Sequence, residues 1–187
     1  MVARIGPPPK PPLTQWALTS VHEGVVPHLY LDTRGNVTCG VGFLVRTVSA
    51  LAAYPWHPSV ATARGDWAEL HRPDVLSGRM PDYYRKICCA RLTTEGMRAV
   101  FEDRVLAFRA ALETHWQLSR QPEDVQLALV DMAYQLGAVG LRRFVKLHAA
   151  VMARDYRTAM YESYRRDASP TRNANTAKLF EAAALAV

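Results

Sequence analysis

The sequence predicts an α+β fold, in which a β-hairpin near the N-terminus precedes a series of helices. Residues 29–31 and 37–45 carry β-branched and aromatic side chains on either side of a turn that contains Gly35 and Asn36, a pattern typical of two antiparallel strands. From Thr93 onward, apolar residues recur at three- and four-residue steps, which is the spacing of amphipathic helices. The chain therefore combines a small β element with a mainly helical remainder.

The N-terminal region is expected to form a proline-rich arm followed by a short helix. Residues 7–12 hold five prolines interrupted only by Lys10, so residues 1–12 can form neither a helix nor a central strand. This arm is either a solvated leader or a docking ligand for a partner. Thr14 then caps a segment with apolar residues near helical spacing. This first helix would deliver Glu23 to the start of the hairpin.

The stretch from residue 46 to residue 80 is interrupted by prolines, which break regular structure. Within it, residues 60–70 show a helical pattern. We expect Ala61, Ala68 and Leu70 to pack inward in this helix, and Trp67 to lie partly inward.

The rest of the chain is expected to be helical. Thr93 is a suitable N-cap for a long amphipathic helix that runs to Trp116. Pro122 would occupy the first position of the next helix, and Gly137 would end it. Residues 141–152, 156–165 and 176–185 complete the helical array.

Composition limits the classes of function. With 187 residues, 49% of them hydrophobic and 21% charged, the chain has the size and composition of a soluble globular domain. Its net charge of +6 favours an anionic partner, such as peptidoglycan, nucleic acid or anionic lipid. No apolar run is long enough for a transmembrane helix. The basic residues of the last helices are not interleaved with aromatics on one face, so nucleic acid is the weakest of these partners.

Neither the cysteines nor the histidines form a metal-ligand pattern. Cys39, Cys88 and Cys89 are odd in number, and the six histidines lack ligand spacing. We therefore expect reduced thiols, no metal and no cofactor. The N-terminus also lacks the apolar run of a signal peptide, which predicts synthesis in the cytoplasm.

Three polar residues flank the predicted hairpin. Glu23 closes the first helix, Asp32 lies beside the turn, and Thr38 follows the turn, so all three are expected to point into one cleft. Glycoside hydrolysis needs two such carboxyl groups, one protonated to donate to the leaving oxygen and one ionised to activate water. Glu23, among apolar neighbours, suits the acid role, and Asp32, beside a solvated turn, suits the ionised role. A Glu and an Asp at this spacing also occur by chance, so other motifs have to decide.

This arrangement resembles the active-site hairpin of the phage-type lysozymes, glycoside hydrolase family 24. The resemblance rests on the spacing of Glu23, Asp32 and Thr38, followed by a Gly-x-Gly strand at residues 40–42. Residues 134–137, Tyr-Gln-Leu-Gly, are similar to a helix end that faces the cleft in that family. Residues 169–173, Ser-Pro-Thr-Arg-Asn, are similar to its Thr-Pro-Asn-Arg corner.

The resemblance covers residues 16–44 and 92–180 and implies a lysozyme-like fold. In that fold a small lobe with the hairpin and a larger all-helical lobe are joined by a long helix. Residues 13–187 would form this domain, with an insertion around residues 54–89 that either shapes the cleft or only decorates it. The loop between residues 156 and 172 is shorter than in typical members.

The resemblance also implies roles for individual residues. Glu23 would be the general acid, and Asp32, helped by Thr38, would position the attacking water in an inverting reaction. Inverting enzymes keep the two carboxyl groups roughly 6.5 to 9.5 Å apart. Arg172 would pair with Glu23, which favours the ionised carboxylate and works against the acid role unless burial offsets it.

Substrate-binding residues follow from the same resemblance. Gln135 would bind the sugar or the catalytic carboxylate, and Tyr134 would line the groove, although a core position is the alternative for this tyrosine. Phe43 replaces the histidine that usually follows the Gly-x-Gly strand, which leaves Leu44 as the groove-lining residue.

The implied activity is that of a muramidase, a bacteriolytic hydrolase that cleaves the β-1,4 bond between N-acetylmuramic acid and N-acetylglucosamine in peptidoglycan. Such a protein would be an endolysin or a secreted antibacterial effector, acting on the cell wall or periplasm after release, with an immunity or inhibitor protein as a further partner. We expect a monomer. The alternative is a catalytically silent lysozyme-like module that binds peptidoglycan or serves as a structural piece.

Overall fold

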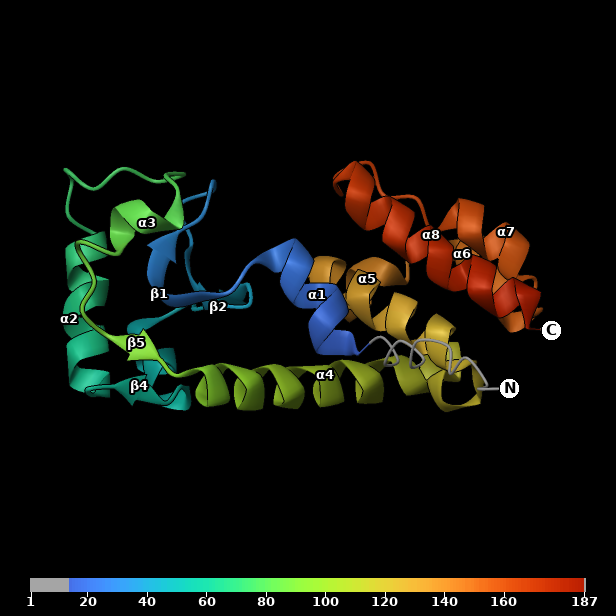
Figure 1. Cartoon of the computed structure of the whole chain (residues 1–187), viewed down its shortest axis with the longest axis horizontal. Helices are drawn as coiled ribbons and strands as arrows, with labels where there is room; N and C mark the ends of the chain where they lie inside the picture. Colours follow the sequence, from blue (N-terminus) through green and yellow to red (C-terminus); the bar gives the residue numbers. More distant parts are fainter. Residues whose placement is uncertain (1–13, 187) are drawn as a thin grey trace, which may run out of the picture.

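The structure is a computed structural model that describes residues 14–186, and it confirms the α+β class. Figure 1 shows short strands gathered at one end, packed helices at the other end, and one long helix, α4 (Thr94–Trp116), reaching between them. We call residues 26–92 the strand-bearing part and residues 118–186 the helical part. The expected proline-rich arm, residues 1–12, lies outside the described residues.

The first helix and the hairpin form where they were expected. α1 (Gln15–Glu23) is capped by Thr14, whose hydroxyl accepts a hydrogen bond from Ala17 N. β1 (Val26–Leu31) and β2 (Val37–Gly40) pair in antiparallel fashion, with Leu31 opposite Val37. Glu23 therefore ends α1 just before the chain enters the sheet.

The prediction of one strand over residues 37–45 is wrong. The chain turns back after Gly40, and β3 (Phe43–Leu44) adds a third antiparallel strand beside β2. Gly40 and Gly42 have φ angles of 59° and 64°, a left-handed conformation that glycine adopts without a steric penalty. The two glycines therefore make the turn that the strand pattern concealed.

The helix predicted over residues 60–70 is confirmed as α2 (Val60–Leu70), with Leu70 buried and Trp67 half-buried. Its inward face was only partly predicted, because Ala61 and Ala68 are exposed. The buried carboxylate of Asp66 accounts for the difference. It accepts hydrogen bonds from the backbone N–H groups of Cys89 and Ala90, which holds another face of the helix against the chain.

The remaining elements of the strand-bearing part are short and share one core with the sheet. These elements are the 3₁₀ helix η1 (Val48–Ala53), β4 (Trp56–His57), α3 (Pro81–Tyr84) and β5 (Arg91–Leu92), where β4 and β5 pair. Trp56, Leu70 and Tyr84 are buried in the same cluster as Leu29 and Phe43. Much of the segment around residues 54–89 therefore packs against the hairpin and shares its apolar core.

The helical part follows the predicted order with shifted boundaries. Its elements are η2 (Leu118–Arg120), α5 (Glu123–Leu141), α6 (Val145–Met152), α7 (Tyr156–Glu162) and α8 (Pro170–Leu185). Pro122 is the N-cap of α5, and Gly137 (φ 73°, ψ 155°) is non-helical, so that one helical segment ends there and a second follows it across a kink. α8 begins at Pro170 instead of residue 176, because the hydroxyl of Ser169 caps its first turn.

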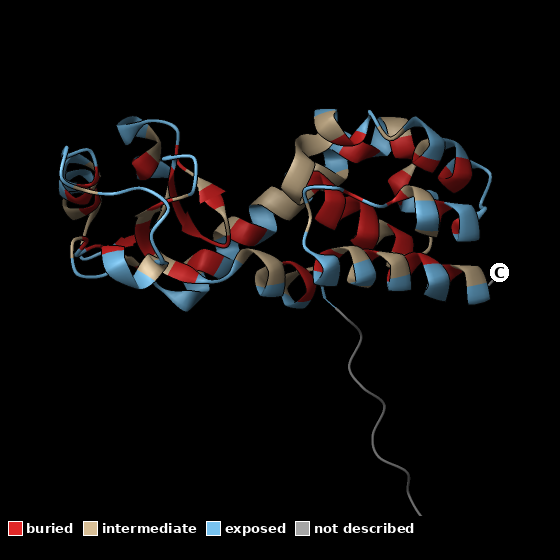
Figure 2. Cartoon of the chain, turned by 90° about the horizontal axis from the view of Figure 1, so that it is seen from above, coloured by how far each residue is buried: buried red, intermediate tan, exposed pale blue. Residues whose placement is uncertain are grey.

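Helix α4 belongs to both apolar cores. Met97 and Phe101, near its start, pack with the strands, and Leu112 and Trp116, near its end, pack with the helices. Figure 2 shows the buried residues in two groups, one at each end of the molecule. A single continuous helix thus sets the position of the sheet relative to the helical part.

One further property concerns the chain as a whole. Between residues 14 and 186, no helix combines the length and the apolar character needed to cross a membrane.

Cys39, Cys88 and Cys89 are free thiols, and burial raises the pKa of Cys39 to about 12.

We predict that stability declines in mild acid because of His28, which is 3% exposed on β1. Its Nε2 lies 2.8 Å from the carbonyl oxygen of Pro81, and its Nδ1 is buried without a hydrogen-bond partner in the described structure. Burial lowers the pKa of His28, against the opposing hydrogen bond to Pro81, whereas in the unfolded chain histidine binds a proton near pH 6.5. The free energy of unfolding should therefore fall as the pH drops below about 6.5.

The measurement is denaturant unfolding of the wild type and His28→Asn at about pH 7 and about pH 5. The variant should lose less stability between the two conditions, because it lacks the buried imidazole. An equal loss in both proteins would contradict the assignment.

Candidate active site

A cavity of about 570 Å³ lies where the hairpin faces α5. Glu23, Asp32 and Thr38 all line it, although they come from the end of α1, the end of β1 and the middle of β2. Leu44 and Gln135 line it as well. Five of the seven residues predicted for the site therefore border the same space.

Asp32 is held by the turn that it precedes. Its Oδ1 accepts hydrogen bonds from the backbone N–H groups of Arg34 and Asn36, both at 2.8 Å. Its Oδ2 accepts one bond from the side-chain amide of Asn36 at 3.0 Å. Behind the turn, the backbone N–H of Gly78 donates to the Asp32 carbonyl at 3.1 Å. The two side-chain oxygens of Asp32 receive hydrogen bonds from donors only, which suits an ionised carboxylate. Oδ2 keeps acceptor capacity for a further ligand such as water.

Thr38 stands on β2 and pairs with Tyr30 on one side and Leu44 on the other. It is only 6% exposed, and its hydroxyl donates a long hydrogen bond of 3.4 Å to the carbonyl of Asn36. The hydroxyl oxygen keeps its acceptor capacity. Thr38 can therefore help Asp32 to hold a small polar ligand in the cavity.

Glu23 is placed by a tight contact with the β2–β3 turn. A Cβ atom added to Gly42 would lie 2.8 Å from Glu23 Oε2, so a larger residue at this position would require the carboxylate to move. The other oxygen, Oε1, accepts a hydrogen bond from Arg172 Nη1 at 2.5 Å. The contact expected between these two side chains is thus present. With 23% of its side chain exposed, Glu23 is partly shielded but still reaches the cavity.

Arg172 in turn is clamped by Asp131, which the sequence analysis missed. Asp131 is 1% exposed in the middle of α5, and its oxygens accept bonds from Arg172 Nε and Nη2, both at 3.0 Å. Thr19 donates to the same carboxylate at 3.3 Å, and Arg165 Nη1 lies 3.5 Å from it. The sequence does contain a signal for it, since Asp131 is the one acidic residue within the apolar run of residues 127–133. A charge buried in such a run needs polar or charged partners.

Two cations and two carboxylates thus neutralise one another beside the cavity. Burial works against the charge of Arg172, but hydrogen bonds and attraction to Asp131 and Glu23 outweigh it and raise its pKa. For Arg165 burial prevails over the attraction of Asp131 and lowers the pKa. Arg172 lies in the first turn of α8, where the helix dipole disfavours a cation, so its two carboxylate partners are needed to hold it there.

Gln135 and Tyr134 have different positions. Gln135 lines the cavity, with its Oε1 2.9 Å from Arg165 Nη1. Tyr134 is not among the residues that line it, and the expectation of a groove-lining role is therefore corrected. Its ring packs between Phe101 and Phe108, and its hydroxyl donates to the carbonyl of Val41 at 2.7 Å. Tyr134 therefore holds the β2–β3 turn through this hydrogen bond, and burial raises the pKa of its hydroxyl.

The arrangement presents two carboxyl groups, those of Glu23 and Asp32, from two different elements around one cavity. Such a pair can perform general acid and base chemistry on a bound substrate. Across residues 14–186, no three His, Cys, Asp or Glu side chains are grouped so that they could hold a metal ion. In comparisons with known proteins, no protein-family model matches the chain, and no significant match to a curated protein is found.

We predict that Gly42→Ala destabilises the protein and displaces Glu23. The added methyl group would collide with Glu23 Oε2 and would occupy a left-handed backbone conformation, which costs a non-glycine residue about 1 kcal/mol or more. Gly65→Ala is the control, because a Cβ at Gly65 meets no atom within 4 Å. Denaturant unfolding should show a loss for Gly42→Ala alone, and equal stability of both variants would refute the packing argument.

We also predict that Asp131→Asn lowers the free energy of unfolding by about 3 kcal/mol, because removing one member of a buried ion pair leaves an uncompensated charge. Asp103→Asn, an exposed substitution on α4, should change stability by less than about 0.5 kcal/mol. If the two variants unfold at the same denaturant concentration, Asp131 does not hold the two arginines.

Proposed function

We propose that the protein is a peptidoglycan hydrolase with the chemistry of the phage-type lysozymes. The observation that carries the proposal is that Glu23, Asp32 and Thr38 line one cavity although they come from three different elements. The long helix α4 between a strand-bearing and a helical part supports a lysozyme-like fold. The net charge of +6 suits a glycan that carries peptide carboxylates.

In the proposed reaction Glu23 is the general acid. Oε1 faces Arg172, so Oε2 is the oxygen that would carry the proton. It donates this proton to the glycosidic oxygen as the bond from that oxygen to the sugar C1 breaks. A water held by Asp32 and Thr38 attacks C1 from the opposite face and gives its proton to the Asp32 carboxylate. The configuration at C1 is inverted, and the bond cut is the β-1,4 linkage between N-acetylmuramic acid and N-acetylglucosamine.

The acid role requires Glu23 to take up a proton although Arg172 lies beside it. Asp131 makes this possible, because it accepts two hydrogen bonds from the same guanidinium and shares its charge. A substrate that fills the cavity removes water from Glu23, which further disfavours the ionised carboxylate. Arg172 then acts as a positioning residue that keeps Glu23 aimed at the cavity.

The cellular role is proposed at the level of two alternatives. The protein acts on the cell wall either as an endolysin or as a secreted antibacterial effector, and an effector would have an immunity protein as a partner. We propose that it works as a monomer.

A catalytically silent peptidoglycan-binding module is the second candidate. The observation that favours it is the short ion pair between Glu23 and Arg172, which stabilises the ionised form of the proposed acid. The two candidates differ in turnover.

We predict that Glu23→Gln abolishes the clearing of purified cell walls, with a loss of at least about a hundredfold, the usual contribution of a general acid. Glu102→Gln, an exposed substitution on α4, should keep wild-type activity. Both variants are first compared by thermal unfolding to establish that they fold. Undiminished clearing by Glu23→Gln would refute the catalytic role of Glu23. Wild-type protein that binds cell walls but releases no reducing ends would support the catalytically silent module instead.

A further inference from the structure

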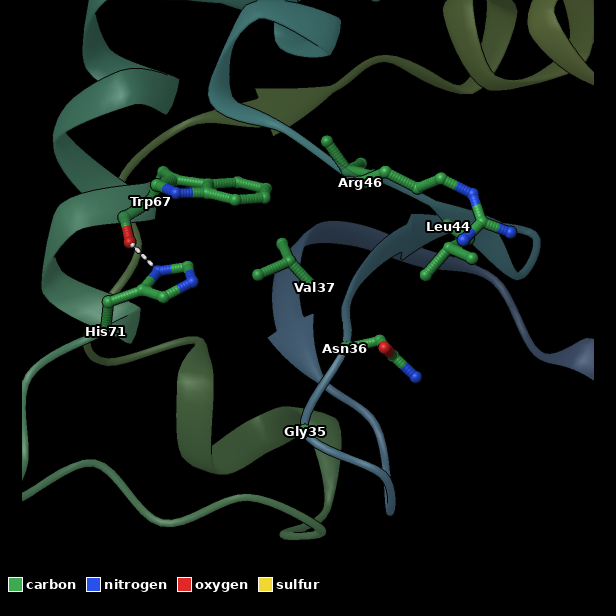
Figure 3. A pocket seen from close by; sticks show the side chains of 8 residues that line it. Gly35, Asn36, Val37, Leu44, Arg46, Trp67 and His71 are labelled. Carbon is green, nitrogen blue, oxygen red and sulfur yellow. Dashed lines mark hydrogen bonds between the residues drawn. The ribbon is translucent and has the colours of Figure 1, made fainter.

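A second cavity adjoins the candidate active site. It has a volume of about 220 Å³ and shares Asn36 and Leu44 with the larger cavity. Figure 3 shows its two walls, with Trp67 of α2 and His71, which follows that helix, on one side and the hairpin with Val37 on the other. The α2 wall belongs to residues 54–89, the segment that the lysozyme resemblance leaves out. A ligand that extends from the active site past Leu44 would enter this second cavity.

Arg46 supplies a cation to the second cavity. In Figure 3 its side chain extends from the strand end toward Leu44 and away from Trp67. Arg46 lines the second cavity, and within residues 14–186 its guanidinium has neither an ion pair nor a hydrogen bond. A guanidinium presents several donors in a geometry that matches a carboxylate. The position therefore suits an anionic group on the ligand.

His71 supplies an acceptor on the opposite wall. Its Nδ1 lies 2.7 Å from the carbonyl oxygen of Trp67, and because a carbonyl only accepts, this nitrogen must carry the proton. In the neutral ring Nε2 then has a free lone pair. The ring is fixed in place by stacking on Trp67, with centroids 4.9 Å apart. An amide N–H of a ligand can therefore donate to His71 Nε2.

The apolar part of the cavity lining is small, because Val37 and Val45 are only 3% and 2% exposed. Leu44, which is half-buried, supplies most of it. The amide nitrogen of Asn36 is committed to Asp32, at 3.0 Å from Oδ2, so a ligand that touches Asn36 also touches the support of the proposed water-binding carboxylate. The cavity thus offers one cation, one acceptor and a small apolar surface.

We propose that this second cavity binds the stem peptide of peptidoglycan, the short peptide that branches from the glycan strand and carries carboxylates. The inference rests on the proposed function, because the strand itself would occupy the larger cavity. A peptide carboxylate pairs with Arg46, a peptide N–H donates to His71, and a small side chain of the peptide contacts Leu44. A glycan strand whose lactyl groups are amidated and carry no peptide supplies no carboxylate for Arg46.

The experiment measures binding without turnover. The full chain with Glu23→Gln is titrated with a soluble glycan fragment that carries stem peptides, and with a peptide-free fragment of the same length in which each lactyl carboxyl is capped as a simple amide and so bears no charge. Arg46→Gln and His71→Ala are added to this background one at a time. Arg64→Gln is the charge-matched control, because Arg64 is an exposed arginine of α2 that does not line this cavity.

Arg46→Gln should weaken binding of the peptide-bearing fragment by about fivefold, the upper value for an exposed ion pair, and the loss should shrink at high salt. His71→Ala should weaken the same fragment by about fivefold, the value of a single hydrogen bond of about 1 kcal/mol. Neither change should affect the peptide-free fragment, and Arg64→Gln should affect neither fragment.

Three results would overturn the inference. An equal loss for both fragments would make the second cavity a sugar site, an equal loss for Arg64→Gln would reduce the effect to net charge, and no loss would leave the cavity outside the binding surface. A wild type that cleaves no glycan would defeat the proposed function, whereas the difference between the two fragments would still decide what the second cavity binds.

Discussion

The chain of contacts from Glu23 to Arg172 to Asp131 is the constraint on which the rest of the structure depends. Glu23 ends a helix next to the sheet, whereas Arg172 and Asp131 belong to α8 and α5 of the helical part. These residues join segments up to 149 positions apart in the chain. Because buried charges are tolerated only when they are paired, this ion-pair network requires α1, α5 and α8 to be packed together.

The rigid elements around this chain of contacts explain why the cavity has its position. α4 belongs to both apolar cores, and Tyr134 fastens α5 to the β2–β3 turn through the carbonyl of Val41. The same turn contains Gly42, which packs directly against the Glu23 carboxylate. Helix, turn and carboxylate are thus packed in series, which places the Glu23 carboxylate at the border of the cavity. In the proposed reaction this placement would aim the acid at one bond of a bound substrate.

Most of the fold and part of the site could be predicted from the sequence. Local patterns were sufficient for α2, for the caps of α1 and α4, and for the hairpin that carries Asp32 and Thr38. The β2–β3 turn was missed because β-branched residues around Gly40 and Gly42 continue a strand pattern, while the reversal depends on positive φ angles. Asp131 was missed because its partners are 34 and more residues away, and no local spacing reveals them. The groove-lining role of Tyr134 came from the lysozyme resemblance, whereas the alternative of a core aromatic ring, which its side-chain type favours, is the one that the structure shows.

The central claim is that the two carboxyl groups of this cavity hydrolyse the bond that follows N-acetylmuramic acid. Mass spectrometry of borohydride-reduced products, released from purified peptidoglycan by the wild-type protein, tests it most directly. The account predicts fragments that end in reduced N-acetylmuramic acid and have gained one water molecule. Fragments that end in reduced N-acetylglucosamine or in an anhydro sugar, or the absence of any new chain ends, would contradict it.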